Sequence, residues 1–219
     1  MIMDGNKRWS MLNNVSLKEG YVRGLYKIKE IVKICIDEKI KYLTLFALSS
    51  ENIKRPSVSI IFDILYNEYN NLLEEFEFKN NVKIKIIGEK KGISSRIYKI
   101  LNNIENKTKE NKKLNLNIAF NYGTNKELLS IIKNIIDIYK NKKIIIDDAL
   151  LQEHMYLSNI PDPDLLIRTG GFQRLSNFLL LKLSYTELFF TKTLWPDFNK
   201  KELLEIFESY KNIERNYGL

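Results

Sequence analysis

The stretch Leu-Asn-Leu-Asn-Ile-Ala-Phe-Asn-Tyr-Gly, residues 114–123, decides the fold that the sequence predicts. Every second residue from Leu114 to Phe120 is apolar, and this period of two is the pattern of a β-strand with one face toward a core. Asn121 and Gly123 then supply residues that favour a turn. We therefore predict a strand that delivers a polar turn to one edge of a sheet.

Apolar runs on both sides of this stretch predict further strands. They cover residues 42–47, 82–86, 165–167 and 188–191, and Met1-Ile2 is the end of a short strand. Between the strands, apolar residues recur every three or four positions, which is helical periodicity. The predicted helices cover residues 22–36, 58–76, 97–104, 128–139, 147–156, 177–184 and 203–213. Strands that alternate with helices predict an α/β fold with a mostly parallel, six-stranded central sheet surrounded by helices.

Composition and charge narrow the class of protein. The 219 residues contain no internal repeat and no linker, so one domain over 1–219 is expected. The net charge of +8 permits anionic partners, but no block of five basic residues occurs, and a nucleic-acid binder rests on net charge alone. The single Cys35 and the absence of a signal peptide predict a cytoplasmic protein, at most peripheral on the inner face of the membrane.

Polar clusters follow four of the predicted strands. They are residues 4–8, 49–55, 121–123 and 168–176. Because parallel sheets bind ligands at the carboxyl ends of their strands, we expect these clusters to form a single crevice.

The cluster Met3-Asp4-Gly5-Asn6-Lys7-Arg8-Trp9 combines a carboxylate with two cations. Gly5 allows close approach of the backbone to a ligand, and a helix that begins near Lys7 points free N–H groups at the same place. The combination predicts a site for a metal-chelated phosphate. The alternative is a turn that carries an exposed group of charges.

Two groups of basic side chains are suited to phosphate. Arg168 and Arg174, with Ser176, offer guanidinium donors and a hydroxyl around a double-glycine turn. Arg8 and Arg55, joined by Lys7, form the second group. Two such groups beside one carboxylate fit a transfer between two diphosphate substrates, and no Walker A loop is present.

Six ordered blocks of the sequence resemble the signature blocks of cis-prenyltransferases, the family of undecaprenyl diphosphate synthase. The blocks are Met3–Trp9, Ser49–Asn52 with Arg55-Pro56, Asn117–Ala119 with Asn121–Gly123, Asp164–Gly171, Arg174–Phe178 and Leu194–Phe198. They span nearly the whole chain in family order.

The resemblance implies Mg²⁺-dependent condensation of isopentenyl diphosphate onto an allylic primer such as farnesyl diphosphate, with a cis double bond formed in each step. It implies a long product, undecaprenyl diphosphate for the cell-wall lipid carrier, which partitions to the membrane. It also implies an apolar tunnel for the growing chain, a homodimer, and no nucleic-acid partner.

The resemblance also assigns roles to individual residues. Asp4 matches the catalytic, metal-binding aspartate, and Glu187 matches a glutamate that helps to hold Mg²⁺. Asn52 and Ser49 match polar residues near the reacting centre. The residues expected to bind the substrates are Gly5, Asn6, Lys7, Arg8, Trp9, Tyr21, Ser49, Ser50, Arg55, Arg168, Arg174 and Ser176.

The chain departs from the family pattern at several positions. Tyr21 replaces a common histidine, Ile53 replaces a tryptophan, and Phe172-Gln173 replaces a pair that begins with glutamate. The C-terminal Arg-x-Gly reads Asn216-Tyr217-Gly218. A non-catalytic accessory subunit of the same fold is therefore the alternative to an enzyme, although Asp4 and the paired arginines argue against it.

Overall fold

The computed structural model describes residues 1–74, 76, 81–140 and 143–214. The helices are α1 (Asn6–Leu12), α2 (Leu17–Asp37), α3 (Val58–Leu73), α4 (Ser95–Thr108), α5 (Thr124–Tyr139), α6 (Asp148–Glu153) and α7 (Lys200–Lys211), with 3₁₀ turns η2 (Leu180–Lys182) and η3 (Trp195–Asp197). The strands are β1 (Tyr42–Ser49), β2 (Val82–Ile87), β3 (Leu114–Tyr122), β4 (Leu165–Arg168) and β5 (Glu187–Phe190). The described helices include none that is both long and apolar enough to cross a membrane.

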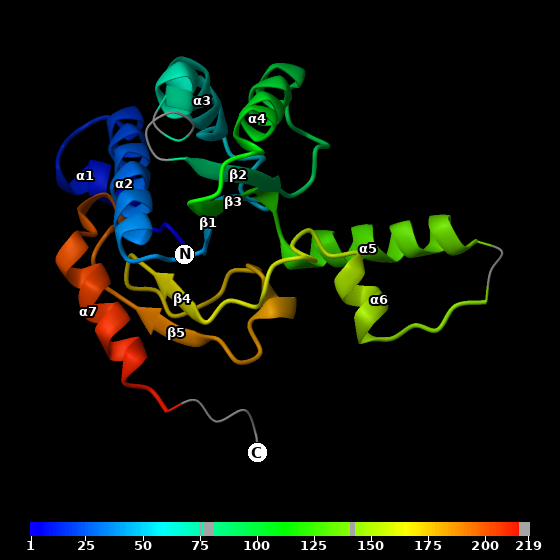
Figure 1. Cartoon of the computed structure of the whole chain (residues 1–219). Helices are drawn as coiled ribbons and strands as arrows, with labels where there is room; N and C mark the ends of the chain where they lie inside the picture. Colours follow the sequence, from blue (N-terminus) through cyan, green and yellow to red (C-terminus); the bar gives the residue numbers. More distant parts are fainter. Residues whose placement is uncertain (75, 77–80, 141–142, 215–219) are drawn as a thin grey trace.

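All strand pairs among the described residues are parallel, as predicted. β1, β3 and β2 form one sheet with β3 in the middle, and β4 pairs with β5. Ile2 joins the two sheets, because it bridges Phe46 of β1 and Arg168 of β4. Figure 1 shows the N-terminus between β1 and β4. The α/β fold with parallel sheets is thus confirmed, with a single bridging residue in the position between β1 and β4 where a further strand was expected.

Helix α2 is the central support of the three-stranded sheet. It begins with a capping box, in which the Ser16 hydroxyl accepts from the Glu19 N–H and the Glu19 carboxylate accepts from the Ser16 N–H. Gly24 leaves space for the Asn6 side chain, since a Cβ there would lie 2.2 Å from the Asn6 Oδ1. The Trp195 indole of η3 donates to the Gly24 carbonyl of α2 at 2.9 Å. Helices α1 and α2 and the turn η3 therefore pack closely together next to the Met3–Trp9 block, the first motif of the chain.

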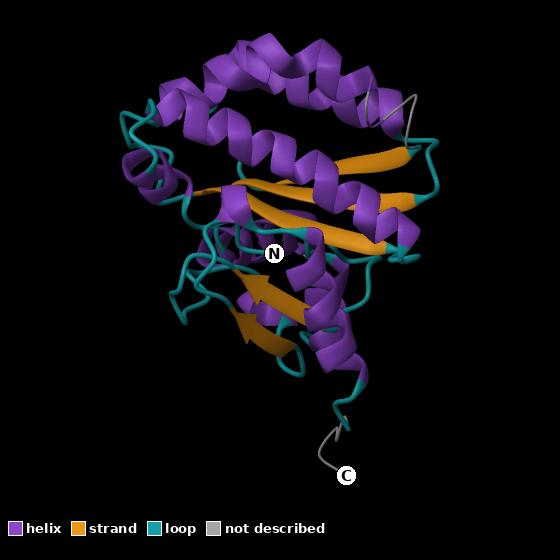
Figure 2. Ribbon diagram, turned by 90° about the vertical axis from the view of Figure 1, so that its left-hand side faces the viewer, coloured by secondary structure: helices purple, strands orange, loops and turns teal. Residues whose placement is uncertain are grey.

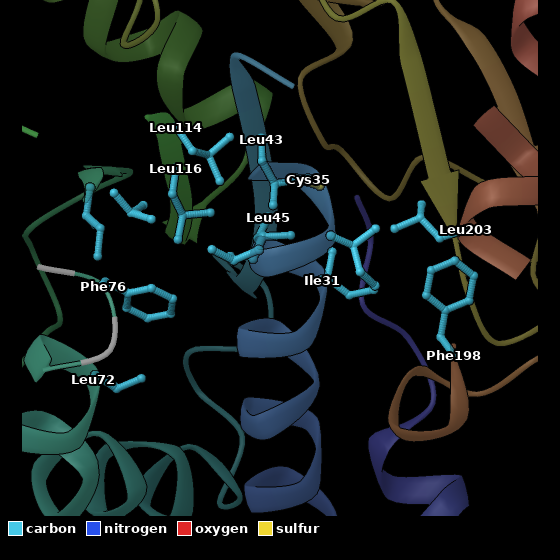
Figure 3. Packing of buried hydrophobic residues seen from close by; sticks show 14 of the residues in the cluster. Ile31, Cys35, Leu43, Leu45, Leu72, Phe76, Leu114, Leu116, Phe198 and Leu203 are labelled. Atoms are coloured by element: carbon cyan, nitrogen blue, oxygen red, sulfur yellow. The ribbon is translucent and has the colours of Figure 1, made fainter. Parts of the chain in front are cut away.

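The main core lies between α2 and the sheet. Ile31 and Cys35 of α2 face Leu43 and Leu45 of β1, as Figure 3 shows. Leu116 of β3 is fully buried in the same cluster. Burial of a large apolar side chain contributes about 1.5–3 kcal/mol, so this layer holds the strands in register. Helices α2, α3 and α4 cover one side of the three-stranded sheet (Figure 2).

Residues 177–184 do not form the predicted helix, and only the 3₁₀ turn η2 is present there. Ser176, Asn177 and Leu179 have φ angles of 51°, 62° and 50°. These left-handed conformations interrupt an α-helix. A contact with the start of α5 stabilises these conformations, because the Asn177 carbonyl accepts from the Thr124 N–H at 2.9 Å. The segment thereby serves as a connection to the start of α5.

Candidate active site

The polar strand ends meet at one edge of the sheets, as the sequence predicted. Ser50 follows β1 and donates its N–H to the Tyr122 carbonyl of β3 at 2.8 Å. On the other sheet, Arg168 ends β4 and contacts Asp4. Asn177 links the two halves, because its side-chain amide donates to the Glu51 carboxylate at 2.9 Å. The clusters therefore lie at the same edge of the two sheets, and the single crevice that they would form stays a prediction.

The Asp4 carboxylate is held between two guanidinium groups. Arg168 donates to its Oδ2 at 2.8 Å, and Arg8 donates to its Oδ1 at 3.2 Å. The Asp4 side chain is 27% exposed, so it remains accessible to a ligand. An acid that is oriented on both oxygens by cations has a fixed direction before any substrate arrives.

Thr169 fixes the backbone of Asp4. The Asp4 N–H donates to the Thr169 hydroxyl at 3.0 Å, and that hydroxyl donates to the Asp4 carbonyl at 2.8 Å. Thr169 is fully buried. This role was not predicted from the sequence, since nothing distinguishes a threonine after an arginine from other threonines.

Arg168 is almost fully buried, with 3% of its side chain exposed. Besides Asp4 it contacts the Ser176 hydroxyl at 2.9 Å and the Arg174 carbonyl. These bonds tie the loop after the double glycine to the end of β4. The predicted group of Arg168, Arg174 and Ser176 is therefore brought together by one guanidinium.

The residues of the first motif lie around Asp4. Gly5 has a φ of 120°, and a Cβ there would lie 2.9 Å from the Leu194 side chain, so only glycine fits. Helix α1 begins at Asn6, close to the predicted start, and the buried Asn6 Oδ1 has no hydrogen-bond partner in the described part of the chain. Lys7 is exposed, and the Trp9 indole donates to Asp197 at 2.8 Å.

The loop after β1 carries the remaining predicted polar residues. Its turn is closed by the Asn52 N–H, which donates to the Ser49 hydroxyl at 3.1 Å. The Arg55 N–H donates to the Asn52 carbonyl at 2.9 Å, and the Arg55 side chain is exposed. Glu51 has a lowered pKa: partial burial acts to raise it, but hydrogen bonds from Asn177 and from its own loop outweigh that effect.

Glu187 does not lie beside Asp4 within this chain. It pairs with Leu165 at the amino end of β4, whereas Arg168, the contact of Asp4, pairs with Phe190. Along the strand direction, Glu187 is therefore three residues, or about 10 Å, from the position of Arg168. The role of Glu187 in metal binding stays a prediction, and residues 215–219, with the altered C-terminal motif, lie outside the described residues.

The donor chemistry at Asp4 fits Mg²⁺ that arrives with a diphosphate. Mg²⁺ commonly takes one or two carboxylates together with substrate phosphate oxygens. The two Asp4 oxygens each accept one guanidinium bond and keep further lone pairs. No three or more His, Cys, Asp or Glu side chains in the described ranges are grouped so that they could hold a metal ion. An all-protein metal cage is thus not what these residues build.

An apolar cavity of about 140 Å³ lies between the sheet and helices α2, α3 and α4. Asn6 and Tyr21 line it, which connects it to the first motif, and Phe76 lines it from the end of α3. A larger cavity of about 560 Å³ lies at the amino ends of β1 and β4, and none of the Asp4, Arg8, Arg168 and Arg174 side chains lines it. None of these four side chains lines the smaller cavity either, but Met3 and Asn6, which flank Asp4 and Gly5 in the sequence, do line it.

Known proteins with similar sequences show the family of this chain. A prenyltransferase family model, described as "Putative undecaprenyl diphosphate synthase", matches residues 2–218. The isoprenyl transferase of Thermotoga maritima is 40% identical over all of this chain and 94% of its own length. That of Aquifex aeolicus is 38% identical over the same shares.

Two solved structures have the same fold. Lavandulyl diphosphate synthase from Lavandula x intermedia, in complex with dimethylallyl diphosphate, has a TM-score of 0.93 and 30% identity, and the match covers 100% of this chain and 96% of that one. A protein described as a probable undecaprenyl diphosphate synthase from Campylobacter jejuni has a TM-score of 0.80 and 34% identity, with 90% and 93% covered. The chain belongs to the cis-prenyltransferase family of undecaprenyl diphosphate synthases and is a prenyltransferase of isoprenoid biosynthesis.

Proposed function

We propose that this enzyme condenses isopentenyl diphosphate repeatedly onto farnesyl diphosphate and produces undecaprenyl diphosphate, the precursor of the cell-wall lipid carrier. The observation that carries the proposal is the Asp4 carboxylate, which lies between Arg8 and Arg168 and close in sequence to Met3 and Asn6, two residues that line the apolar cavity. The site thus offers cations for diphosphates and an apolar space for hydrocarbon.

Two groups of donors would receive the two diphosphates. Arg8 and Arg55, with the backbone at Gly5 and Asn6, would hold the allylic diphosphate. Arg174 and Ser176, organised by the buried Arg168, would hold isopentenyl diphosphate. Guanidinium groups bind phosphate oxygens in a bidentate manner, which fixes both orientation and charge.

Asp4 and the diphosphate of a substrate would together hold Mg²⁺, and Glu187 is a further candidate ligand. When bound, the metal would neutralise charge on the departing diphosphate. The arginines contribute to the same end, because they stabilise the anion that forms as the allylic C–O bond breaks. The new carbon–carbon bond joins the allylic carbon to isopentenyl diphosphate, which then loses a proton.

The apolar cavity would accept the hydrocarbon of the primer and keep water from the cation-like allylic carbon. Its volume of about 140 Å³ is too small for a long polyprenyl chain. We propose that it widens into a tunnel as the product grows. The apolar product would then pass from the cytoplasmic enzyme to the membrane.

An exposed apolar surface on α5 supports the proposed homodimer. Leu129, Ile132 and Ile136 are 53%, 45% and 60% exposed and lie on one face of this helix. Helices α5 and α6 extend away from the sheets in Figure 1. Leu188 of β5 is also exposed, at 43%. Large exposed apolar patches mark interaction surfaces, and a second copy of the chain would cover the apolar face of α5.

The direct test follows labelled isopentenyl diphosphate into butanol-extractable lipid, with farnesyl diphosphate and detergent, in Mg²⁺ or in EDTA. We expect product of undecaprenyl length that forms only with Mg²⁺. Shorter product would correct the chain length alone. No product from folded protein would contradict the proposal and favour the accessory-subunit alternative.

A further inference from the structure

Three guanidinium groups gather around the ring of Phe172. The Cζ atoms of Arg174, Arg8 and Arg168 lie 4.1, 4.7 and 5.9 Å from the ring centroid. All three distances are within the range of a cation–π interaction. Phe172 is 41% exposed, so it lies at the surface and is not part of the core.

The backbone before Phe172 is fixed. Gly170 and Gly171 have φ angles of 87° and 80°, which favour glycine. Their N–H groups donate to the Thr193 and Thr191 carbonyls at 2.8 and 2.7 Å. The double-glycine turn therefore presents Phe172 from a defined position.

The charges around the ring do not balance. Of the three guanidinium groups, Arg8 and Arg168 share the single Asp4 carboxylate. The Arg174 guanidinium makes no hydrogen bond or ion pair within the described residues, because its hydrogen bond to Arg168 uses the backbone carbonyl, and it lies over the Phe172 ring. Three positive charges thus face one negative charge. The negative face of an aromatic ring attracts such cations without neutralising them.

We propose that Phe172 is a positioning residue for the two diphosphates. It holds Arg174 and Arg8 close together while both keep their full charge for the ligands. The assignment of the ligands as diphosphates rests on the proposed function. Because Arg8 belongs to the allylic group and Arg174 to the isopentenyl group, one ring links both binding groups.

A carboxylate at this position would act differently. It would form ion pairs with the same arginines, and a diphosphate would have to displace it. The ring has no charge to be displaced, and it reduces the rotamer entropy that Arg174 loses on binding. The proposal therefore predicts that F172E weakens diphosphate binding more than F172L does.

The first experiment measures the affinity for inorganic pyrophosphate by calorimetry in EDTA. We expect F172L to weaken binding about three- to tenfold, which corresponds to the loss of one or two cation–π contacts. F172Y, which keeps the ring, is the matched control and should stay within about twofold of the wild type. In an R174Q background the effect of F172L should shrink, because one of its partners is already absent.

Kinetics provide a readout that a merely structural role would not change. F172L should raise KM for both substrates and leave kcat nearly unchanged, whereas R174Q should raise KM mainly for isopentenyl diphosphate. Wild-type affinity for pyrophosphate in F172L, or a loss in F172Y as large as in F172L, would overturn the proposal. Pyrophosphate binding needs no turnover, so absent product with the expected binding pattern would reject the proposed reaction and leave the role of Phe172 intact.

Discussion

The two groups of basic side chains differ in how far the fold fixes them. Arg168 is buried, and its guanidinium contacts Asp4, Ser176 and the Arg174 carbonyl. Arg55 lies on the exposed loop after β1, and its side chain makes no hydrogen bond or ion pair within the described residues. Arg168 is therefore preorganised, as is Arg8 through its ion pair with Asp4, whereas no such contact holds the Arg55 side chain within the described residues. Preorganised groups bind with less loss of entropy, so the two sides should respond differently to substitution.

The largest effect should follow from loss of the buried guanidinium. Arg168→Ala leaves Asp4 without its shorter ion pair and frees the loop at Ser176. We expect turnover to fall about 10²–10³-fold, as for loss of an oriented charge in an active site. The free energy of unfolding should fall by about 1–3 kcal/mol, because hydrogen bonds to charged groups are lost. Kinetics and denaturant titration check both numbers, and equal sensitivity of Arg168→Ala and Arg55→Ala would remove the contrast between the two sides.

Substitution on the exposed side should affect binding alone. Arg55→Ala is expected to raise KM for farnesyl diphosphate about tenfold, the value of one charge-assisted contact. Stability should change by less than about 0.5 kcal/mol, since the side chain is exposed. Lys54→Ala, on the same loop, is the matched control. A substantial loss of stability in Arg55→Ala would show that the fold holds this side as firmly as the other.

The smallest effect should come from Glu51, which links the two sides through Asn177. The pKa of Glu51 is lower in the folded protein than in the unfolded chain. As the pH falls, Glu51 therefore takes up a proton at a higher pH in the unfolded chain than in the folded protein. This contribution to stability is complete above the ordinary pKa of 4.5 and is lost as the pH falls further. Between pH 7 and pH 3, the melting temperature should therefore fall slightly more for the wild type than for Glu51→Gln. Identical slopes would show that the link contributes nothing.

Much of the fold and part of the site follow from the sequence. The alternation at Leu114 to Phe120 predicts β3, and the rule that parallel strands end at one edge predicts that Asp4 and Arg168 lie together. The break at Asn177 was not predicted, because its left-handed backbone depends on Thr124, far away in the sequence. The gathering of arginines at Phe172 also escaped prediction, since it depends on side-chain directions in three separate segments.

For Glu187, its place at the start of a strand could have predicted its distance from Asp4. It stands at the start of a predicted strand, and the same rule that gathers strand ends at the site places a strand start at the opposite edge. The structure has this arrangement, with Glu187 opposite Leu165. The order of residues along a strand therefore carries information about distance that a comparison of motifs alone does not.

The central claim is that Asp4, oriented by Arg8 and Arg168, is the carboxylate of the reaction. The most direct measurement compares turnover of Asp4→Asn and wild type at saturating substrates with Mg²⁺, with pyrophosphate affinity in EDTA measured alongside. The substitution keeps the shape of the side chain and removes its charge. We predict that turnover falls at least about 10³-fold while pyrophosphate still binds, because the arginines remain in place. Turnover within tenfold of the wild type would contradict the account.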